Sequence, residues 1–145
     1  MMLSESIRVA ESRDLSDILH LERQFGVYAF SPSEFKKRLG SHLFKVLEVE
    51  GIVLGYYLVL PRKNTRSFRL YSICVDPAMH GQGYGKLLMR DAINQCGPGA
   101  KIKLEVKWDN HTARKLYSSF GFVCTKMLRG YYGIDDDGVE MRLST

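Results

Sequence analysis

Hydrophobic residues alternate with polar ones in some segments of the chain and recur every three or four residues in others. Alternation is typical of strands and the longer interval of helices. Together they predict the order β-α-α-β-β-β-α-β-α-β-β. The expected strands cover residues 7–10, 43–49, 52–60, 68–75, 102–106, 122–128 and 139–143, and the expected helices cover 15–25, 31–40, 84–96 and 113–120.

Residues that cap helices or form turns separate these elements. The segment Ser31–Glu34 supplies a capping serine, a proline for the first turn and the glutamate of a capping box. Glu50-Gly51 is expected to form a hairpin turn, and Gly97-Pro98-Gly99 to end the third helix. The helix between the strands 68–75 and 102–106 predicts a right-handed crossover and a parallel pair. The hairpins are antiparallel, so the sheet is mixed.

Length and composition indicate a single globular domain, residues 1–145. The chain has 145 residues, of which 45% are hydrophobic and 26% charged. The longest apolar stretches, such as Ile52 to Leu60, are far too short to span a bilayer, and the N-terminus shows no signal-peptide pattern. Cys74, Cys96 and Cys124 are odd in number and form no CxxC motif. We interpret them as reduced thiols in a cytoplasmic protein.

The formal net charge of +5 favours an anionic partner, such as a phosphorylated cofactor, a nucleic acid or an acidic peptide. Lysines and arginines are scattered along the chain, which is more typical of a solvated surface than of a dedicated nucleic-acid groove. The four histidines have no metal-ligand spacing, and no HExxH motif occurs, so no metal site is expected.

A glycine-rich segment, His80–Lys86, lies directly between an expected strand and an expected helix. Unpaired N–H groups and the positive end of the dipole make a helix N-terminus suitable for an anion, and glycines let the backbone approach a phosphate. Such a segment can hold a pyrophosphate or can simply reverse the chain. The spacing excludes a Rossmann fingerprint, because the third glycine position holds Lys86 or Leu88. It also excludes a Walker A loop, because Gly85-Lys86 is followed by Leu87.

The stretch from Leu70 to Ile93 resembles the acetyl-CoA-binding motif of the GNAT superfamily of N-acetyltransferases, (Arg or Gln)-x-x-Gly-x-(Gly or Ala). Gly83 and Gly85 match this motif, whereas His80 stands where Arg or Gln is usual. The second half resembles the ribosomal-protein alanine N-acetyltransferases and related protein N-terminal acetyltransferases. The residues that carry this second resemblance are Leu104-Glu105-Val106, Asn110, Ala113, Leu116-Tyr117, Gly121-Phe122 and Tyr131-Tyr132.

The resemblance implies an α/β (α+β) fold with a mixed, mostly antiparallel central sheet. One parallel pair of strands would splay at the cofactor site, with helices on both faces of the sheet. It also implies acetyl-CoA as cosubstrate. The residues expected to bind it are Ile73, Cys74 and Val75 at the pantetheine arm, Gly81, Gln82, Gly83, Tyr84, Gly85 and Lys86 at the pyrophosphate, and Asn110 near the splay.

Two side chains are the candidates for proton transfer. By resemblance, Glu105 is the general base, acting through water, although its place between Lys103 and Lys107 also suits the charged face of a strand. Tyr117 is the candidate general acid for the departing thiolate. A phenol of pKa ~10 can donate to a thiolate of conjugate pKa ~8.5 with a modest penalty. The alternative is that Tyr117 only packs in the apolar stripe of its helix.

The choice of acceptor rests on the pKa of the amine. An α-amine of pKa ~7.8 is about one-third neutral at pH 7.5, whereas a lysine amine of pKa ~10.4 is only about 0.1% neutral. A lone carboxylate therefore suits a protein N-terminus. Aromatic loops at Phe25–Phe30 and Tyr131–Gly133 are expected to border the acceptor, with Phe30, Tyr131 and Tyr132 contacting it.

The sequence leaves several alternatives to this acceptor open. They are a small-molecule amine, a lysine side chain, or a module that binds acetyl-CoA without catalysis. We expect no membrane partner. We expect direct transfer in a ternary complex, with no acetylated Cys74 or Cys124 on the reaction path.

Overall fold

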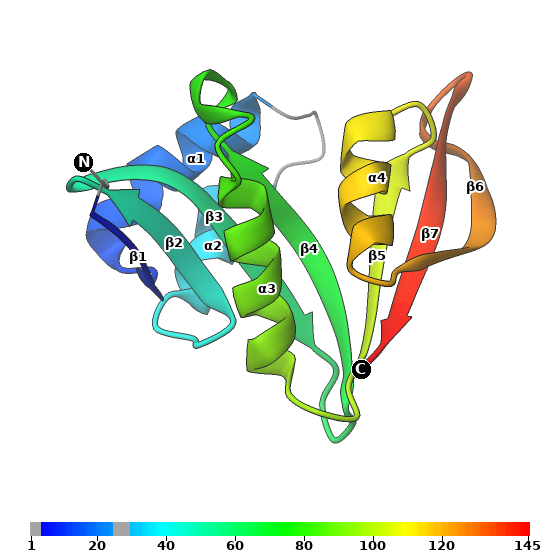
Figure 1. Cartoon of the computed structure of the whole chain (residues 1–145), viewed down its shortest axis with the longest axis horizontal. Helices are drawn as coiled ribbons and strands as arrows, with labels where there is room; N and C mark the ends of the chain where they lie inside the picture. The colour runs from blue at the N-terminus through cyan, green and yellow to red at the C-terminus, as the bar shows by residue number, and fades with distance from the viewer. Residues whose placement is uncertain (1–3, 25–29) are drawn as a thin grey trace. The chain divides into compact units, whose positions relative to one another are not determined.

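The computed structural model describes residues 4–24 and 30–145, which form two compact units. Unit 1 consists of Met1–Val59 and Ser72–Gln95, and unit 2 of Leu60–Tyr71 and Cys96–Thr145. The predicted order of strands and helices is confirmed (Figure 1). The strands are β1 (Glu5–Val9), β2 (Phe44–Val49), β3 (Ile52–Pro61), β4 (Ser67–Val75), β5 (Lys101–Lys107), β6 (Val123–Gly133) and β7 (Asp136–Ser144). The α-helices are α1 (Leu15–Arg23), α2 (Pro32–Arg38), α3 (Tyr84–Cys96) and α4 (His111–Ser119), and the short 3-10 helices are η1 (Ser12–Asp14) and η2 (Pro77–Met79).

The strands form one seven-stranded sheet in the order β1-β2-β3-β4-β5-β7-β6. The sheet is mostly antiparallel, and the pair β4–β5 is parallel, as the strand-helix-strand pattern predicted. The turn at Glu50-Gly51 has positive φ at both residues, 51° and 80°, which is the geometry of a tight hairpin turn. The longest helix, α3, has 13 residues, and no helix in the described part of the chain is long and apolar enough to cross a membrane.

Helices cover both faces of the sheet in unit 1. On one face Phe35 of α2 is fully buried, with its ring 5.9 Å from the ring of Phe44 and 6.1 Å from that of Tyr56. Tyr57 points to the opposite face, because successive strand residues alternate. There its hydroxyl donates to Asp91 on α3. The predicted placement of helices on both faces is therefore confirmed for this unit.

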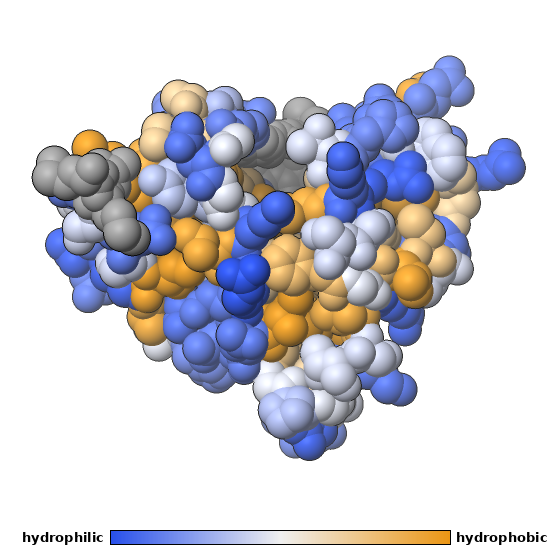
Figure 2. Space-filling model, viewed as in Figure 1, coloured by the Kyte–Doolittle hydropathy of each residue, from blue (hydrophilic) through white to orange (hydrophobic). Residues whose placement is uncertain are grey.

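Unit 2 has one buried and one charged sheet face. On β5, Ile102, Leu104 and Val106 are at most 5% exposed, and the residues between them are charged. The helix α4 lies against the buried face (Figure 1), and Gly121, two residues after it, lies next to the side chain of Leu143, the β7 partner of Ile102. Hydrophobic residues also reach the surface of unit 2 (Figure 2). Met127 on β6, for example, is 44% exposed.

The structure corrects the predicted end of the chain. Tyr131-Tyr132 was expected in a connection between strands, but β6 continues to Gly133 and β7 begins at Asp136. The turn is only Ile134-Asp135, with φ of 55° at Asp135. The ladder shifts register between Leu128 and Gly133. Because of this irregularity, hydrophobic and polar residues do not alternate in this part of the hairpin. The sequence prediction depended on that alternation, so the glycines and acidic residues here indicated a loop.

Two smaller expectations also need correction. The third strand was expected over residues 52–60, but β3 extends one residue further, to Pro61. The N-cap of α2 is confirmed, because the Ser31 hydroxyl accepts a hydrogen bond from the Glu34 N–H. In a capping box, the carboxylate of Glu34 would accept a hydrogen bond from the backbone N–H of Ser31. Here it pairs with Lys37 instead.

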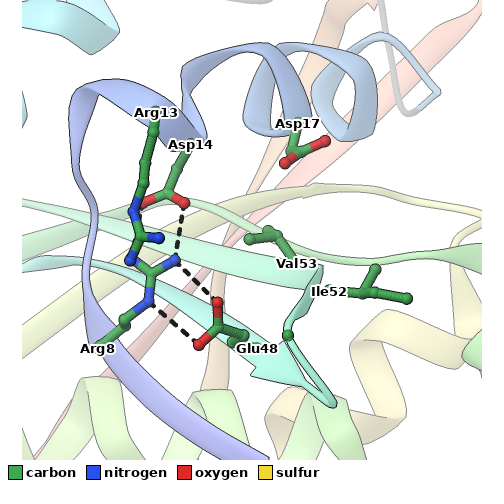
Figure 3. Close-up of a pocket in the computed structure, with 8 residues that line it drawn as sticks. Arg8, Arg13, Asp14, Asp17, Glu48, Ile52 and Val53 are labelled. Atoms are coloured by element: carbon green, nitrogen blue, oxygen red, sulfur yellow. Dashed lines mark hydrogen bonds and ion pairs between the residues drawn. The ribbon is translucent and has the colours of Figure 1, made fainter.

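An ion-pair network joins β1, η1 and β2 in unit 1 (Figure 3). The guanidinium of Arg8 donates two hydrogen bonds of 2.8 Å to the carboxylate of Asp14 and a longer one, 3.3 Å, to Glu48. Asp14 is 2% exposed and also accepts from the Glu11 N–H. These contacts, with the hydrogen bonds from Arg8 as the largest cause, hold the pKa of Asp14 below its usual value.

We expect Asp14→Asn to lower the free energy of unfolding by about 2–4 kcal/mol at pH 7, because it leaves Arg8 without its buried partner. The pKa of Asp14 is lower in the folded state than in the unfolded state. The contribution is therefore complete above the unfolded pKa of about 3.9 and is lost as pH falls through the folded value. Urea unfolding at pH 7 and at pH 3 measures this, and the difference between variant and wild type should shrink at pH 3. Asp17→Asn is the matched control, because Asp17 lies at the same hollow but is exposed (Figure 3). A loss as large in the control would contradict the assignment to the ion pair.

Candidate active site

The predicted phosphate-binding segment forms an open turn at the start of α3 in unit 1. Gly81 and Gly83 both have φ of +85°, a conformation that favours glycine. A side-chain carbon added at either would meet no atom within 4 Å. The backbone N–H groups of the first turn of α3 have no acceptor within the helix. The turn therefore fits an anion such as a pyrophosphate, with its backbone accessible from outside.

The side chains of this segment divide into two sets. Gln82 and Lys86 are exposed, whereas Tyr84 is 6% exposed and packs in the core of unit 1. His80 stands at the position where the family motif has Arg or Gln. Its Nε2 atom lies 3.0 Å from the carbonyl oxygen of Val75. His80 thus contacts the end of β4 and helps to shape the turn.

The predicted pantetheine-binding residues are at the end of β4. Cys74 and Val75 are 5% and 8% exposed, and Ile73 is half-buried. The Cys74 thiol lies 3.3 Å from the hydroxyl of Ser72. Burial raises the pKa of this thiol to about 11. Cys74 is therefore a poor nucleophile at neutral pH, because the thiolate is the reactive form.

A buried polar cluster lies next to Cys74, and the sequence analysis did not identify it. The Tyr56 hydroxyl donates to the carboxylate of Glu22 and lies 2.9 Å from Ser72, which itself donates to Glu22 over 3.2 Å. Burial, together with Cys74 and Glu22, raises the pKa of Tyr56 well above its ordinary value. One signal was present in the sequence, because Glu22 is the single charged member of an otherwise apolar helical stripe.

Glu105 lies on the charged face of β5 in unit 2, with its side chain 12% exposed. One carboxylate oxygen is 2.9 Å from Nε of Arg69. The parallel register of β4 and β5, which pairs Arg69 with Lys103, brings this arginine to Glu105. Sequence reasoning missed Arg69, because it predicted the parallel pair without its register.

Two predicted acceptor residues join Glu105 on this face. The Tyr131 hydroxyl is 3.5 Å from the Glu105 carboxylate and 3.4 Å from Nη2 of Arg69. The rings of Tyr131 and Tyr132 meet edge to face at 4.9 Å. Tyr131 is 43% exposed, while burial, followed by the nearby Tyr131 and Glu105, raises the pKa of Tyr132 to about 12. Glu105, Tyr131 and Tyr132 therefore form one cluster, as a shared site would require.

The ring of Tyr132 rests on Gly138. A side-chain carbon added there would lie 2.8 Å from Cε2 of Tyr132 and 3.2 Å from the carbonyl oxygen of Val106. We expect Gly138→Ala to displace the ring and to lower kcat/KM for the acceptor by about tenfold, since small misplacements at a site are costly. Overpacking should also cost about 1–3 kcal/mol of stability. Initial rates and thermal unfolding measure the two effects. Tyr132→Phe, which keeps the ring, is the control, and an unchanged rate in Gly138→Ala would show that the ring position does not matter.

Asn110 and Tyr117 lie on α4 in unit 2. Asn110 is the N-cap of this helix, and its side-chain oxygen accepts from the Ala113 N–H over 3.2 Å. Tyr117 is half-buried, with its ring 6.1 Å from that of Phe122. Because α4 covers the buried sheet face, Tyr117 and Glu105 approach β5 from opposite sides.

Phe30, the third predicted acceptor residue, lies in unit 1. Its ring is 5.7 Å from that of Phe35 in an edge-to-face contact, and the guanidinium of Arg38 lies over it at 5.9 Å. The rest of the predicted aromatic loop, residues 25–29, lies outside the described residues. Among residues 4–24 and 30–145, no group of three or more His, Cys, Asp and Glu side chains is placed to hold a metal ion.

Comparison with known proteins identifies the family. The family described as Acetyltransferase (GNAT) domain matches residues 10–144. The N-alpha-acetyltransferase RimI of Mycobacterium tuberculosis is 32% identical over 116 residues, which cover 77% of this chain and 73% of the relative. The [ribosomal protein bS18]-alanine N-acetyltransferase of Escherichia coli K12 is 27% identical over 144 residues, covering 95% and 96%. The crystal structure of the ribosomal-protein-S18-alanine N-acetyltransferase from E. coli superposes with a TM-score of 0.85 at 26% identity, covering 97% of this chain and 94% of the other. The chain therefore belongs to the GNAT acetyltransferase family and is an acetyl-CoA-dependent N-acetyltransferase.

Proposed function

We propose that this N-acetyltransferase modifies the α-amine at the N-terminus of a protein. The observation that carries the proposal is the cluster on the charged face of β5, where Arg69 and Tyr131 orient the carboxylate of Glu105. A carboxylate beside the exposed ring of Tyr131 suits an amine at the end of a peptide. The similarity to an enzyme named for the alanine of ribosomal protein bS18, over nearly the full chain, supports the same class of acceptor.

Acetyl-CoA supplies a thioester whose carbonyl is attacked by the amine. We assign its pyrophosphate to the backbone of Gly81–Lys86, because this turn combines positive φ, open space and a helix N-terminus. We assign the pantetheine arm to the backbone of Ile73–Val75. Asn110 retains its side-chain N–H₂ donors for the cofactor, because its oxygen already caps α4.

Glu105 is proposed as the general base. An α-amine is about one-third neutral at pH 7.5, so a single carboxylate, acting through water, acts on an amine that loses its proton readily. The ion pair with Arg69 fixes the direction in which the carboxylate points. A lysine amine would demand far more of the same group.

Tyr117 is proposed as the general acid that protonates the departing thiolate. Its position on the opposite side of β5 from Glu105 suits separate roles for the two residues. One accepts a proton from the amine, and the other donates a proton to the sulfur as the tetrahedral adduct breaks down. The ring contacts that of Phe122, and the hydroxyl is the group that we propose transfers the proton. Neither step needs an enzyme-bound acetyl group, and burial makes Cys74 a poor candidate for one.

We also propose that residues 1–145 act as a single catalytic domain. The residues assigned to the donor are mostly in unit 1, and the proton-transfer residues are in unit 2. The family match extends through both units, from residue 10 to residue 144. The family match thus supports one catalytic domain that includes both units.

Release of the free thiol of CoA from acetyl-CoA tests the proposed acceptor. The panel should contain peptides with a free N-terminus, the same peptides with a blocked N-terminus and a free lysine, and small amines. Turnover selective for the free-N-terminus peptides is the expected result. Turnover with small amines or lysine alone would overturn the proposed acceptor while leaving the family unchanged.

A further inference from the structure

The net positive charge of the protein comes from unit 2. This unit contains twelve Lys and Arg residues and six Asp and Glu residues, whereas unit 1 contains nine and ten. The net charge of +5 is therefore the sum of a nearly neutral unit and a strongly basic one. The excess positive charge that can attract an anionic partner over a distance is therefore carried by unit 2.

Six cations of unit 2 point to the same face of the sheet as Glu105. Directly paired residues of neighbouring strands share a face, and residues two apart on one strand do so too. The register pairs Lys103 with both Arg69 and Arg142, and Glu140 with both Glu105 and Lys126. We call this the basic face, and its cations are Arg69, Lys101, Lys103, Lys107, Lys126 and Arg142.

Three carboxylates on the basic face neutralise half of these cations. Glu105 pairs with Arg69 at 2.9 Å, Asp136 with Lys107 at 3.1 Å, and Glu140 with Arg142 at 3.0 Å. The three remaining cations are exposed and form no ion pair with any residue that the structure describes. They are Lys101, Lys103 and Lys126.

From this charge distribution we infer that the enzyme selects acceptor proteins with acidic residues directly behind the N-terminal amine. The inference rests on the proposed function, because it requires the amine to reach Glu105. Lys103 and Lys107 are each two positions from Glu105 along β5, or about 7 Å at the usual rise of a strand. This is within the screening length of about 8 Å at physiological ionic strength. A peptide whose first residue is at Glu105 therefore places its next residues in a positive potential.

A short acidic peptide fits the basic face better than a nucleic acid. Proteins that bind nucleic acid tightly contact several phosphates, commonly 6–10 of them, whereas only three cations here lack a carboxylate partner. The carboxylates of Glu105 and Glu140 lie between these cations and would repel a continuous phosphate backbone. Two or three acidic side chains are about equal in number to the three lysines and carry the opposite charge.

The test measures kcat/KM for three peptides that share the first residue and carry acidic, neutral or basic residues at positions two to four. Each acidic residue should raise kcat/KM about 2- to 5-fold over the neutral peptide, and basic residues should lower it similarly, because exposed charge pairs are weak. The preference should shrink as salt is raised. If all three peptides are turned over at equal rates, the inferred preference for acidic acceptors is wrong, but the proposed function is not affected. No turnover with any of them would overturn the proposed function as well.

Charge reversal shows whether the basic face causes the preference. The double variant Lys103→Glu with Lys126→Glu should remove or invert the preference for acidic peptides. The matched control is Lys115→Glu, because Lys115 is exposed on α4, which covers the other face of the same unit. The control should keep the preference, and loss of it there would contradict the assignment to the basic face. Tight, salt-dependent binding of unrelated RNA, lost in the double variant while peptide charge has no effect, would replace the peptide with a nucleic acid and overturn the inference.

Discussion

Replacing Glu105 with glutamine is expected to lower kcat/KM for the acceptor peptide by about 10²–10⁴-fold, the usual contribution of a positioned acid or base. The amide keeps the size of the side chain and cannot accept a proton. Below the pKa of the α-amine, about 7.8, most of the acceptor is protonated and the base is needed. The loss should therefore be largest at low pH and should shrink above about pH 9, where the amine is neutral without help.

The ion pair with Arg69 supplies the control for this prediction. If Glu105 only anchors Arg69 on a charged strand face, Arg69→Gln should reduce activity as much as Glu105→Gln does. If Glu105 is the base, Arg69→Gln should cost less, because the carboxylate loses its orientation and keeps its chemistry. The measurements are initial rates from pH 6 to pH 9.5, with acetyl-CoA affinity and thermal midpoint as checks on folding. A loss that is independent of pH, or equal in both variants, would return Glu105 to the structural role.

The fold was predictable wherever the signals were local. Glu50-Gly51 forms the expected hairpin turn, in which Gly51 adopts a positive φ that favours glycine. Ser31 caps α2 because its hydroxyl reaches an N–H three residues away. The strands β6 and β7 were predicted, but their extension to Gly133 and Asp136 was missed because the pairing there is irregular. The strands are held there by cross-strand contacts, such as the hydrogen bond that the Gly130 N–H donates to the side chain of Asp137. These contacts do not produce an alternation of hydrophobic and polar residues in the sequence.

In the candidate site, too, the local features were predictable and the long-range contacts were not. The turn around Gly81 and Gly83 was recognisable because its glycines, the preceding strand and the following helix are contiguous in the sequence. The partner of Glu105 was not, because Arg69 is 36 residues away and meets it only through the register of a parallel pair. The contact of Tyr132 with Gly138 likewise depends on how two strands twist together. Spacing within a motif is local, but the position of one strand against another is decided by the packing of the whole sheet.

Replacing Tyr117 with phenylalanine is expected to lower kcat by about 10²–10³-fold while leaving acetyl-CoA affinity nearly unchanged. The ring and its contact with Phe122 remain, so α4 keeps its packing. Only the hydroxyl is lost, and with it the proton for the departing thiolate. The sulfur must then leave as an anion or take a proton from water, which raises the barrier for breakdown of the tetrahedral adduct.

The pH profile separates an acid from a packing residue. An acid must be protonated to act, so kcat of the wild type should fall at alkaline pH, where phenols ionise, and this fall should be absent in Tyr117→Phe. Ser118→Ala is the matched control, because it removes a hydroxyl from the neighbouring exposed residue of the same helix and should change neither kcat nor the profile. Retention of the alkaline fall in Tyr117→Phe, or a kcat close to that of the wild type, would assign the thiolate proton to another group. Tyr117 would then have a packing role in α4, to which its contact with Phe122 contributes.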